Sequence, residues 1–341
     1  MRFFAWYDAG MTDLVAIARS LVVPGKGLLA ADESTHTAVK RLASYGIGTS
    51  EEMRREYRDL FLETPGVEQY LSGVILYEET LDQKGSDKKL FPKSLLSRGI
   101  EPGIKVDTGT EPFPESPNEL ITNGLIGLPE RLKEYAKMGA TFTKWRAVVT
   151  IDGDTLPTGK AIHENARRLA NYAKDVQAAG MVPILEPEVL LDGKHSRERT
   201  KAVLIETLST LFAVLDEHAV DRASVILKTA MALTGSGSSK RDTPEEVAES
   251  TLEALLEAVP RQVAGIVFLS GGQDPEEATE NLAAISRQAK EKEAPWPLTF
   301  SYARALQEEA LAVWKGKEEN VDAAREAFMN RLKKVSAALS S

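Results

Sequence analysis

The chain has no cysteine and only four histidines among its 341 residues. Without cysteine, disulfide bonds, thiolate catalysis and cysteine-ligated zinc are excluded. The histidines are far apart in the sequence, no two of them at the spacing of metal ligands, and each is typical of a surface or loop position. We therefore expect no metal site and no other cofactor.

Long apolar runs are missing as well. No segment approaches the roughly 20 apolar residues of a membrane-spanning helix, and the aromatic start, Met1–Asp8, is too short and too soon acidic for a secretory signal. We expect a cytoplasmic protein with no membrane partner, in which Met11 is an alternative start and residues 1–10 a possible extension. The formal net charge of −9 argues against a nucleic-acid partner. An anionic substrate would therefore need a local cluster of cations.

What the chain does contain is a repeated alternation of short apolar segments and amphipathic helices. Apolar residues make up 43% of the sequence and charged residues 27%, which is usual for a globular protein with a large core. Near-continuous apolar runs bounded by turns are typical of parallel strands covered on both faces. Eight segments fit this description: Lys26–Asp32, Gly73–Thr80, Gly103–Asp107, Phe142–Thr150, Val182–Val189, Ser224–Lys228, Gly265–Ser270 and Leu298–Ser301.

The spacing of polar residues at the ends of these segments favours one architecture. Equal intervals of 42 residues separate Lys144, Glu186, Lys228 and Ser270. Successive βα units of similar length would give this spacing, and eight such units form a barrel of about 250 residues. The alternative is an open doubly wound sheet, but the G-x-G-x-x-G turn typical of that fold is missing. The predicted fold is a single-domain α/β (β/α)8 TIM barrel over residues 1–341, with a final helix and short tail over 319–341.

Three lysines lie inside the apolar segments, where lysine is uncommon: Lys105, Lys144 and Lys228. Taken alone, each is better explained by a side chain that reaches from a strand end to solvent. Residues two apart on a strand share a face, however, and the ends of barrel strands converge on the C-terminal mouth, where barrel enzymes have their active sites. The charged residues that would meet there are Lys105 with Asp107, Lys144 with Arg146, Glu186 with Glu188, and Lys228 and Asp32.

This combination of charges predicts a particular chemistry. A buried lysine near other cations loses its proton more easily and becomes a nucleophile. A carboxylate beside it, such as Glu186, can then shuttle protons as the adduct with a carbonyl loses water. The sequence therefore predicts an enzyme in which a buried lysine, with Lys144 and Arg146 nearby, is a nucleophile toward a carbonyl group.

A candidate phosphate site follows the last two strands. Glycines after a strand let backbone amides approach an anion near a helix N-terminus, and the loops after strands seven and eight of a barrel often bind phosphate. A Ser-Gly-Gly turn alone commonly only closes a loop. Lys40 and Arg41 are candidates for a second phosphate, although two cations on a solvated helix face explain them equally well. The residues of the first site are Ser270, Gly271, Gly272, Ser301 and Arg304.

Six segments together resemble the class I fructose-bisphosphate aldolase family. They occur in collinear order from about Leu14 to about Gly316. Any one segment could arise by chance, but six in order are highly specific. The segments are Gly25–Thr35, Gly73–Thr80, Lys144–Arg146, Val182–Glu188, Phe268–Gln273 and Thr299–Leu306.

The resemblance implies a lyase that reversibly cleaves fructose 1,6-bisphosphate to dihydroxyacetone phosphate and glyceraldehyde 3-phosphate in glycolysis and gluconeogenesis. It implies that Lys228 forms the Schiff base and that Glu186 is the general acid/base. Asp32 would take the C4 hydroxyl proton, and Lys144 would assist carbinolamine formation. The implied substrate contacts are Arg146, Glu188 and Lys105, with Ser270, Gly271, Gly272, Ser301 and Arg304 at one phosphate and Ser34, Thr37, Lys40 and Arg41 at the other.

The sequence departs from the family pattern at several positions. Family members usually have Glu-Gly before the nucleophile strand and Pro-Asn after the lysine, where this chain has Ala223-Ser224 and Thr229-Ala230. Ala303 and His36 each replace a usual glycine. The last tyrosine is Tyr302, so we expect a group other than the C-terminal tyrosine of animal members to exchange the enamine proton.

Three alternatives follow from these departures and from the fold. Sedoheptulose 1,7-bisphosphate is an alternative substrate, and a transaldolase-like transferase also uses a barrel lysine but would not need two phosphate sites. A non-catalytic scaffold on the same fold would need none of the retained catalytic positions, and fold alone decides nothing. The resemblance also implies a homotetramer.

Overall fold

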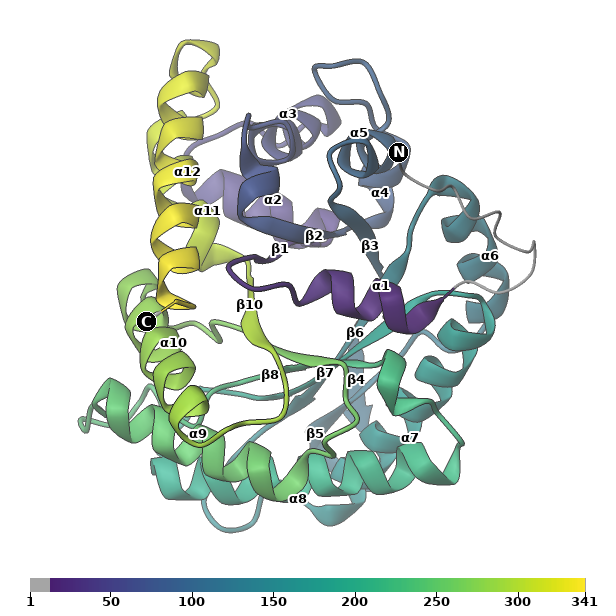
Figure 1. The fold of residues 1–341 in the computed structure, drawn as a ribbon, viewed down its shortest axis with the longest axis vertical. Helices are drawn as coiled ribbons and strands as arrows, with labels where there is room; N and C mark the ends of the chain where they lie inside the picture. The colour runs from purple at the N-terminus through teal and green to yellow at the C-terminus, as the bar shows by residue number, and fades with distance from the viewer. Residues whose placement is uncertain (1–12, 341) are drawn as a thin grey trace, which may run out of the picture.

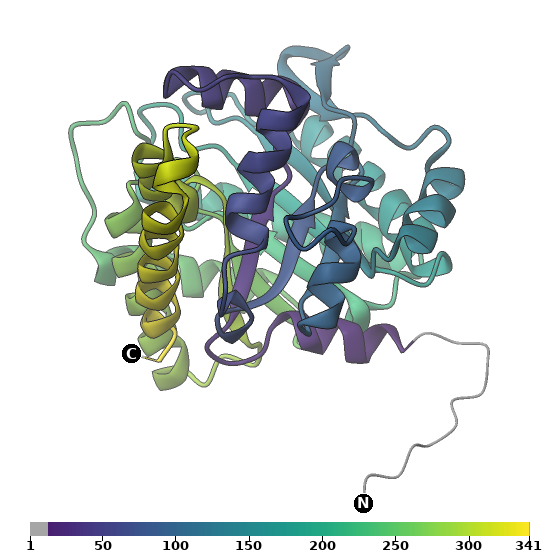
Figure 2. The same cartoon turned by 90° about the horizontal axis from the view of Figure 1, so that it is seen from above.

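The computed structural model describes residues 13–340, in which eight parallel strands form a closed barrel inside a ring of helices (Figures 1 and 2). The strands follow one another in chain order around the barrel, and β10 pairs with β1 to close it. All eight predicted strands are present, and the predicted TIM barrel is confirmed. The barrel strands are β1 (Gly27–Ala31), β2 (Leu71–Leu76), β3 (Glu101–Lys105), β6 (Phe142–Val149), β7 (Val182–Val189), β8 (Ile226–Thr229), β9 (Gly265–Phe268) and β10 (Leu298–Tyr302).

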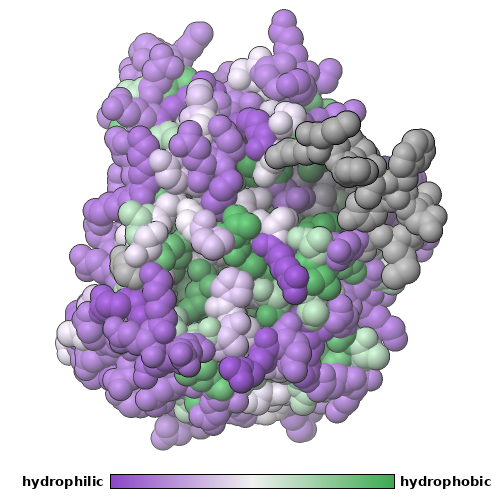
Figure 3. Space-filling model, viewed as in Figure 1, coloured by the Kyte–Doolittle hydropathy of each residue, from purple (hydrophilic) through white to green (hydrophobic). Residues whose placement is uncertain are grey.

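Helices surround the barrel, and most of the face seen in Figure 3 is hydrophilic, with apolar side chains gathered near its middle. Within the described residues, none of the helices has the length and apolar character needed to cross a membrane. Residues 1–10, interpreted as a possible extension, lie outside the described residues. The helices are α1 (Leu14–Leu21), α2 (Thr35–Ser44), α3 (Glu51–Leu62), α4 (Glu78–Leu81), α5 (Phe91–Ser97), α6 (Leu128–Met138), α7 (Gly159–Ala178), α8 (Arg197–Glu217), α9 (Pro244–Ala258), α10 (Pro275–Glu291), α11 (Arg304–Trp314) and α12 (Val321–Ala338).

The N-terminal end of the barrel is closed by α1. Its buried residues Ala18 and Leu21, together with Val22, belong to the same apolar cluster as residues that fill the inside of the barrel, such as Ile75 and Ile184. The Leu21 carbonyl accepts a hydrogen bond of 2.7 Å from the hydroxyl of Ser72 on β2. Because this end is filled, ligands have access to the barrel only from the carboxyl ends of the strands.

The strand register brings the charged residues of neighbouring strands to one level. Lys105 of β3 is the register partner of Lys144 of β6. Arg146, two residues further along β6, is the partner of Glu186 of β7. Since all these strands are parallel, the polar residues at their carboxyl ends face one common opening.

Two elements differ from the predictions. The strand expected over Gly73–Thr80 ends at Leu76, because the apolar run ends there and Glu78–Leu81 form the short helix α4. The sequence also gave no indication of the antiparallel hairpin of β4 (Thr110–Phe113) and β5 (Ser116–Thr122). Most residues of β4 are exposed, so this hairpin lacks the apolar pattern on which the strand predictions depended.

Gly103 of β3 and Phe142 of β6 lie very close together in the barrel wall. A methyl group at Gly103 would lie 2.2 Å from the ring of Phe142, its register partner, and an aromatic ring in a packed core cannot easily move aside. We expect Gly103→Ala to lower the free energy of unfolding by roughly 1–3 kcal/mol, measured by chemical denaturation.

The matched control is Gly48→Ala, since the nearest atom to its added methyl group is 4.0 Å away. This variant should be as stable as the parent or slightly more stable. Phe142→Leu should partly relieve the effect of Gly103→Ala, so that the double variant is more stable than the sum of the single effects predicts. Equal stability of the Gly103→Ala and Gly48→Ala variants would contradict this account of the barrel wall.

Candidate active site

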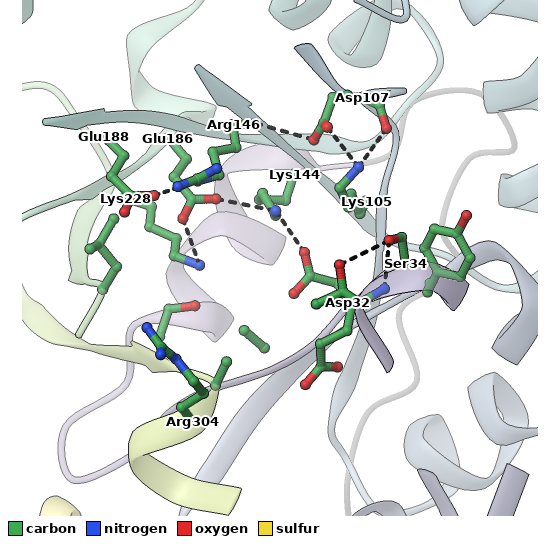
Figure 4. A pocket seen from close by; sticks show the side chains of 18 of the residues that line it. Asp32, Ser34, Lys105, Asp107, Lys144, Arg146, Glu186, Glu188, Lys228 and Arg304 are labelled. Carbon is green, nitrogen blue, oxygen red and sulfur yellow. Dashed lines mark hydrogen bonds and ion pairs between the residues drawn. The ribbon is translucent and has the colours of Figure 1, made fainter. Parts of the chain in front are cut away.

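A pocket of about 960 Å³ opens at the carboxyl ends of the barrel strands. Side chains from β1, β3, β6, β7 and β8 project into it, and the loops after β9 and β10 form one of its rims (Figure 4). The structure brings every candidate site residue of the sequence analysis into the lining of this one pocket: Asp32, Ser34, Thr37, Lys40, Arg41, Lys105, Lys144, Arg146, Glu186, Glu188, Lys228, Ser270, Gly271, Gly272, Ser301 and Arg304.

Four charged side chains of alternating sign form a continuous chain in the pocket floor (Figure 4). The Lys144 Nζ lies 2.6 Å from Asp32 Oδ2 and 3.2 Å from Glu186 Oε2. The other oxygen of Glu186 lies 3.1 Å from the Nζ of Lys228. The side chains of Lys144, Glu186 and Lys228 are at most 5% exposed and that of Asp32 is 12% exposed. We call these four residues the charge chain.

The charge chain keeps its carboxylates ionised. Burial alone would raise the pKa of Asp32, but the positive charges of Lys144 and Lys228 outweigh burial and lower that pKa to about 2. The same balance lowers the pKa of Glu186, where burial is again opposed by the two lysines. Burial would lower the pKa of Lys144, but Asp32 and Glu186 raise it instead. At neutral pH, Glu186 is therefore a carboxylate placed to accept a proton.

A second set of ion pairs lies next to the charge chain. Arg146 donates from Nε to a carboxylate oxygen of Glu188, the residue two places after Glu186 on β7. Lys105 Nζ lies 2.6 Å from Asp107 Oδ1 and donates to the Asp107 carbonyl at 2.7 Å. These pairs present both donors and acceptors to the pocket, which suits a ligand with several hydroxyl groups.

The rim formed by the loops after β9 and β10 has free hydrogen-bond donors. Gly271 and Gly272 have φ values of +58° and +94°, which other residues rarely adopt. The buried hydroxyl of Ser301 has no hydrogen-bond partner within the described part of the chain. Arg304 is exposed and makes no ion pair with any residue of 13–340. An unpaired cation beside turn amides and a free hydroxyl is an arrangement that binds phosphate.

The opposite rim consists of α2 and the residues before it. Ser34 caps this helix by accepting a hydrogen bond of 3.3 Å from the Thr37 amide. Lys40 is exposed and has no ion-pair partner among the described residues. Arg41 differs, because its Nη1 lies 2.6 Å from a Glu33 oxygen and donates to the Gln307 side-chain oxygen at 2.6 Å. Lys40 is therefore the cation with an uncommitted charge on this rim.

Comparison with known proteins gives the family. Residues 13–341 match the model of a family described as glycolytic fructose-bisphosphate aldolase class-I. This chain belongs to the class I fructose-bisphosphate aldolase family. Cytosolic fructose-bisphosphate aldolase 4 of Arabidopsis thaliana is 48% identical over 321 residues, which are 94% of this chain and 81% of that protein. A probable fructose-bisphosphate aldolase class 1 of Xanthomonas campestris is 47% identical over 301 residues, which are 88% of this chain and 89% of that one.

A solved structure agrees with this assignment. The fructose-bisphosphate aldolase of Plasmodium falciparum, crystallised with TRAP and a small-molecule inhibitor, superposes with a TM-score of 0.93. It is 44% identical in sequence, and the match covers 96% of this chain and 93% of that chain. The family resemblance inferred from the six sequence segments is thus confirmed.

A cluster of paired side chains at the wall of the pocket was not predicted from the sequence. Glu33, the neighbour of Asp32, pairs with Arg58 and accepts a hydrogen bond of 2.9 Å from the Tyr57 hydroxyl, in addition to its pair with Arg41. The sequence did not single out Glu33, because it lies in the segment Asp32–Thr35 among other polar loop residues.

Within residues 13–340, no group of three or more histidine and carboxylate side chains is arranged to hold a metal ion.

The lowered pKa of Asp32 gives a pH prediction for the aldolase. A carboxylate with a folded-state pKa of about 2 and an ordinary value of 3.8 stabilises the fold above about pH 4, and this contribution is lost as pH falls toward 2. We expect Asp32→Asn to lower the free energy of unfolding at pH 7 by on the order of 2 kcal/mol. The difference between the two proteins should shrink between pH 4 and pH 2.

Asp192→Asn is the control, because Asp192 lines the same pocket but is exposed and makes no ion pair within the described residues. Its stability should follow that of the parent at every pH, as surface charges contribute little. A constant difference between the parent and Asp32→Asn from pH 7 to pH 2 would show that Asp32 is not held ionised by its neighbours.

Proposed function

We propose that this chain reversibly cleaves fructose 1,6-bisphosphate to dihydroxyacetone phosphate and glyceraldehyde 3-phosphate through an imine on Lys228. The observation that carries the proposal is the contact of 3.1 Å between the Lys228 Nζ and the ionised Glu186, on the floor of a pocket with a cationic rim on either side. Membership of the aldolase family and the names of its relatives support the same substrate.

Glu186 is placed for both proton transfers of imine formation. Transfer of a proton from Lys228 to Glu186 leaves a neutral amine, which adds to the C2 carbonyl of the open-chain sugar to give a carbinolamine. Glu186 then returns the proton to the carbinolamine hydroxyl, and that group leaves as water. Lys144 remains charged throughout, because Asp32 holds it at 2.6 Å, and it stabilises the negative charge that develops on the substrate oxygen.

Asp32 is on the opposite side of Lys144 from Glu186 and is the candidate base for carbon–carbon cleavage. It takes the proton of the C4 hydroxyl while the C3–C4 bond breaks, and the bonding electrons neutralise the iminium to give an enamine. The aldehyde product leaves first. The proton that Asp32 took is then passed on to the enamine carbon, which restores the Asp32 carboxylate and the iminium. Addition of water to the iminium releases dihydroxyacetone phosphate and frees Lys228.

The two rims would hold the two phosphate groups. Ser270, Gly271, Gly272, Ser301 and Arg304 bind one, and Ser34, Thr37 and Lys40 the other, with Arg41 held behind them by Glu33. Lys105, Arg146 and Glu188 contact the hydroxyl groups between the phosphates. A substrate that spans both rims places its reacting carbons over the charge chain, so binding energy at the phosphates is converted into orientation at C2.

Of the alternatives considered above, the comparisons support fructose 1,6-bisphosphate rather than a heptulose bisphosphate, and a scaffold would not need the charge chain. The plant relative is named as cytosolic, which supports a cytoplasmic location, and the family is described as glycolytic, which supports a place in glycolysis. We also propose a homotetramer. Ile126 is 99% exposed in the isolated chain, and burial against a second copy would remove this large apolar side chain from water.

The imine can be tested by chemical trapping. Borohydride reduction in the presence of dihydroxyacetone phosphate should attach the triose covalently to Lys228, because only an imine is reduced to a stable amine there. Peptide mass mapping identifies the site. Lys228→Met should take up no label, and Lys194→Met, which removes an exposed lysine outside the pocket, should be labelled like the parent. Label on any other lysine would refute the assignment.

The roles of the two β7 glutamates can be separated. Glu186→Gln removes the proton shuttle with almost no change in pocket volume, so kcat should fall by roughly 10²–10⁴. Glu188→Gln should lower kcat much less and raise KM, since Glu188 pairs with Arg146 and not with Lys228. Steady-state kinetics decide the matter. If Glu186→Gln stays within a few-fold of the parent in kcat, the acid/base must be sought elsewhere, first at Glu188.

A further inference from the structure

Arg331 of the last helix, α12, is an arginine buried away from the pocket. It is only 2% exposed, and it does not line the pocket. A buried guanidinium is costly unless its N–H groups are paired. In this chain each of its three nitrogen atoms donates a hydrogen bond, and the acceptors come from two other helices. The positions of these acceptors therefore indicate what Arg331 does in the fold.

The partners of Arg331 are in the first turns of α10 and α11. Its Nε donates to the Ala305 carbonyl at 2.9 Å, in the first turn of α11. Its Nη2 donates to the carbonyl of Pro275 and to the hydroxyl of Thr279, both in the first part of α10. Its Nη1 donates to Glu276 at 3.1 Å. One planar side chain therefore fixes the start of α10 relative to the start of α11.

The first turns of α10 and α11 directly adjoin the residues of the proposed phosphate rim after β9 and β10. The turn Ser270–Gly272 leads into α10, whose N-cap is Asp274, and Ala303 is the N-cap of α11, which begins with Arg304. The two loops are in close contact, since a methyl group at Gly272 would lie 3.4 Å from the Arg304 Nη2. Ala305, the acceptor of the Arg331 Nε, directly follows Arg304 in the chain. A shift of one helix start would therefore move the donors of one loop relative to those of the other.

From this geometry we propose that Arg331 is a positioning residue for phosphate: it fixes the distance between the Ser270–Gly272 loop and the junction of β10 with α11 at Ser301–Arg304, and so sets the affinity of that rim without touching the ligand. The proposal rests on the proposed function of the rim. It makes the outer helix α12, which contacts α10, α11 and α3 (Figure 2), part of the binding machinery through one side chain.

The planar guanidinium is suited to this role. It donates in several fixed directions in one plane, whereas a lysine ammonium is a compact point charge on a flexible stem. Lysine at position 331 could pair with the α10 acceptors or with the Ala305 carbonyl, but it would not fix both at once. Arg331→Lys should therefore keep the buried charge and the fold but lose part of the alignment. Arg331→Met fills similar space and loses all of it.

The test measures phosphate binding apart from catalysis. Inorganic phosphate is used as a competitive inhibitor of the full-length protein, beside kcat and KM for the bisphosphate and kcat/KM for a non-phosphorylated ketose. Arg331→Met should weaken phosphate inhibition and raise KM on the order of tenfold, because a misplacement of about 1 Å has effects of this size or larger. Values of kcat and of kcat/KM for the non-phosphorylated ketose should change by less than about threefold. Arg331→Lys should be intermediate.

Two matched variants give the comparison. Arg325→Met removes another arginine from α12, one that lies 3.0 Å from Asp59 of α3, and it should leave phosphate inhibition unchanged even where it lowers the melting temperature. Arg304→Ala removes a proposed direct contact and should weaken inhibition more than Arg331→Met does.

Unchanged phosphate inhibition in folded Arg331→Met would overturn the proposal, as would an equal loss in Arg325→Met. If Arg331→Met does not fold, the test uses Arg331→Lys. Phosphate inhibition of Arg331→Lys equal to that of the parent would then overturn the proposal. Failure of the proposed function is a separate result, because then the parent protein itself would neither cleave the bisphosphate nor be inhibited by phosphate.

Discussion

The chemistry of this protein depends on the mutual neutralisation of four buried charges. Asp32, Lys144, Glu186 and Lys228 would each be costly to bury alone, but in alternation every charge has an opposite neighbour at 2.6–3.2 Å. Removal of one member leaves a neighbour without its full complement, and the loss of a buried partner is far more costly than the pair itself is stabilising. The same alternation leaves Glu186 ionised next to Lys228, the proposed nucleophile, so stability and the proposed readiness for proton transfer arise from one arrangement.

The barrel supplies the precision that this arrangement needs. Each charge comes from a different strand or strand end, and the parallel register aligns Lys105 with Lys144 and Arg146 with Glu186. Because α1 fills the opposite end of the barrel, the charged groups at the carboxyl ends are reached by solvent only from the pocket. The rim after β9 and β10, the proposed site of one phosphate, lies beyond the barrel strands, and there Arg331 joins the starts of α10 and α11.

Most of the barrel could be predicted from the sequence, because buried parallel strands appear there as apolar runs. Most of the pocket lining could be predicted as well, because a charged residue such as Lys228 is rare within such a run. The hairpin of β4 and β5 could not, since its residues are largely exposed and carry no apolar period. Nor could the sequence show that Arg41 is paired with Glu33 and Gln307, because these contacts join residues up to 266 positions apart. Arg331 was missed for the same reason: on a helical stripe it is one more cation, and only the packing of three helices shows its burial.

The ionised state of the Glu186 carboxylate, which lies between Lys144 and Lys228 before substrate binds, underlies the whole arrangement. It can be tested most directly by the infrared difference spectrum between the parent protein and Glu186→Gln, recorded without substrate at pH 7 and again near pH 5. The account predicts that the substitution removes the band of an ionised carboxylate at both pH values, because Lys144 and Lys228 lower the pKa of Glu186. Loss of the carbonyl band of a protonated carboxylic acid would contradict it, and the alternating charges could then not be the resting state of the site.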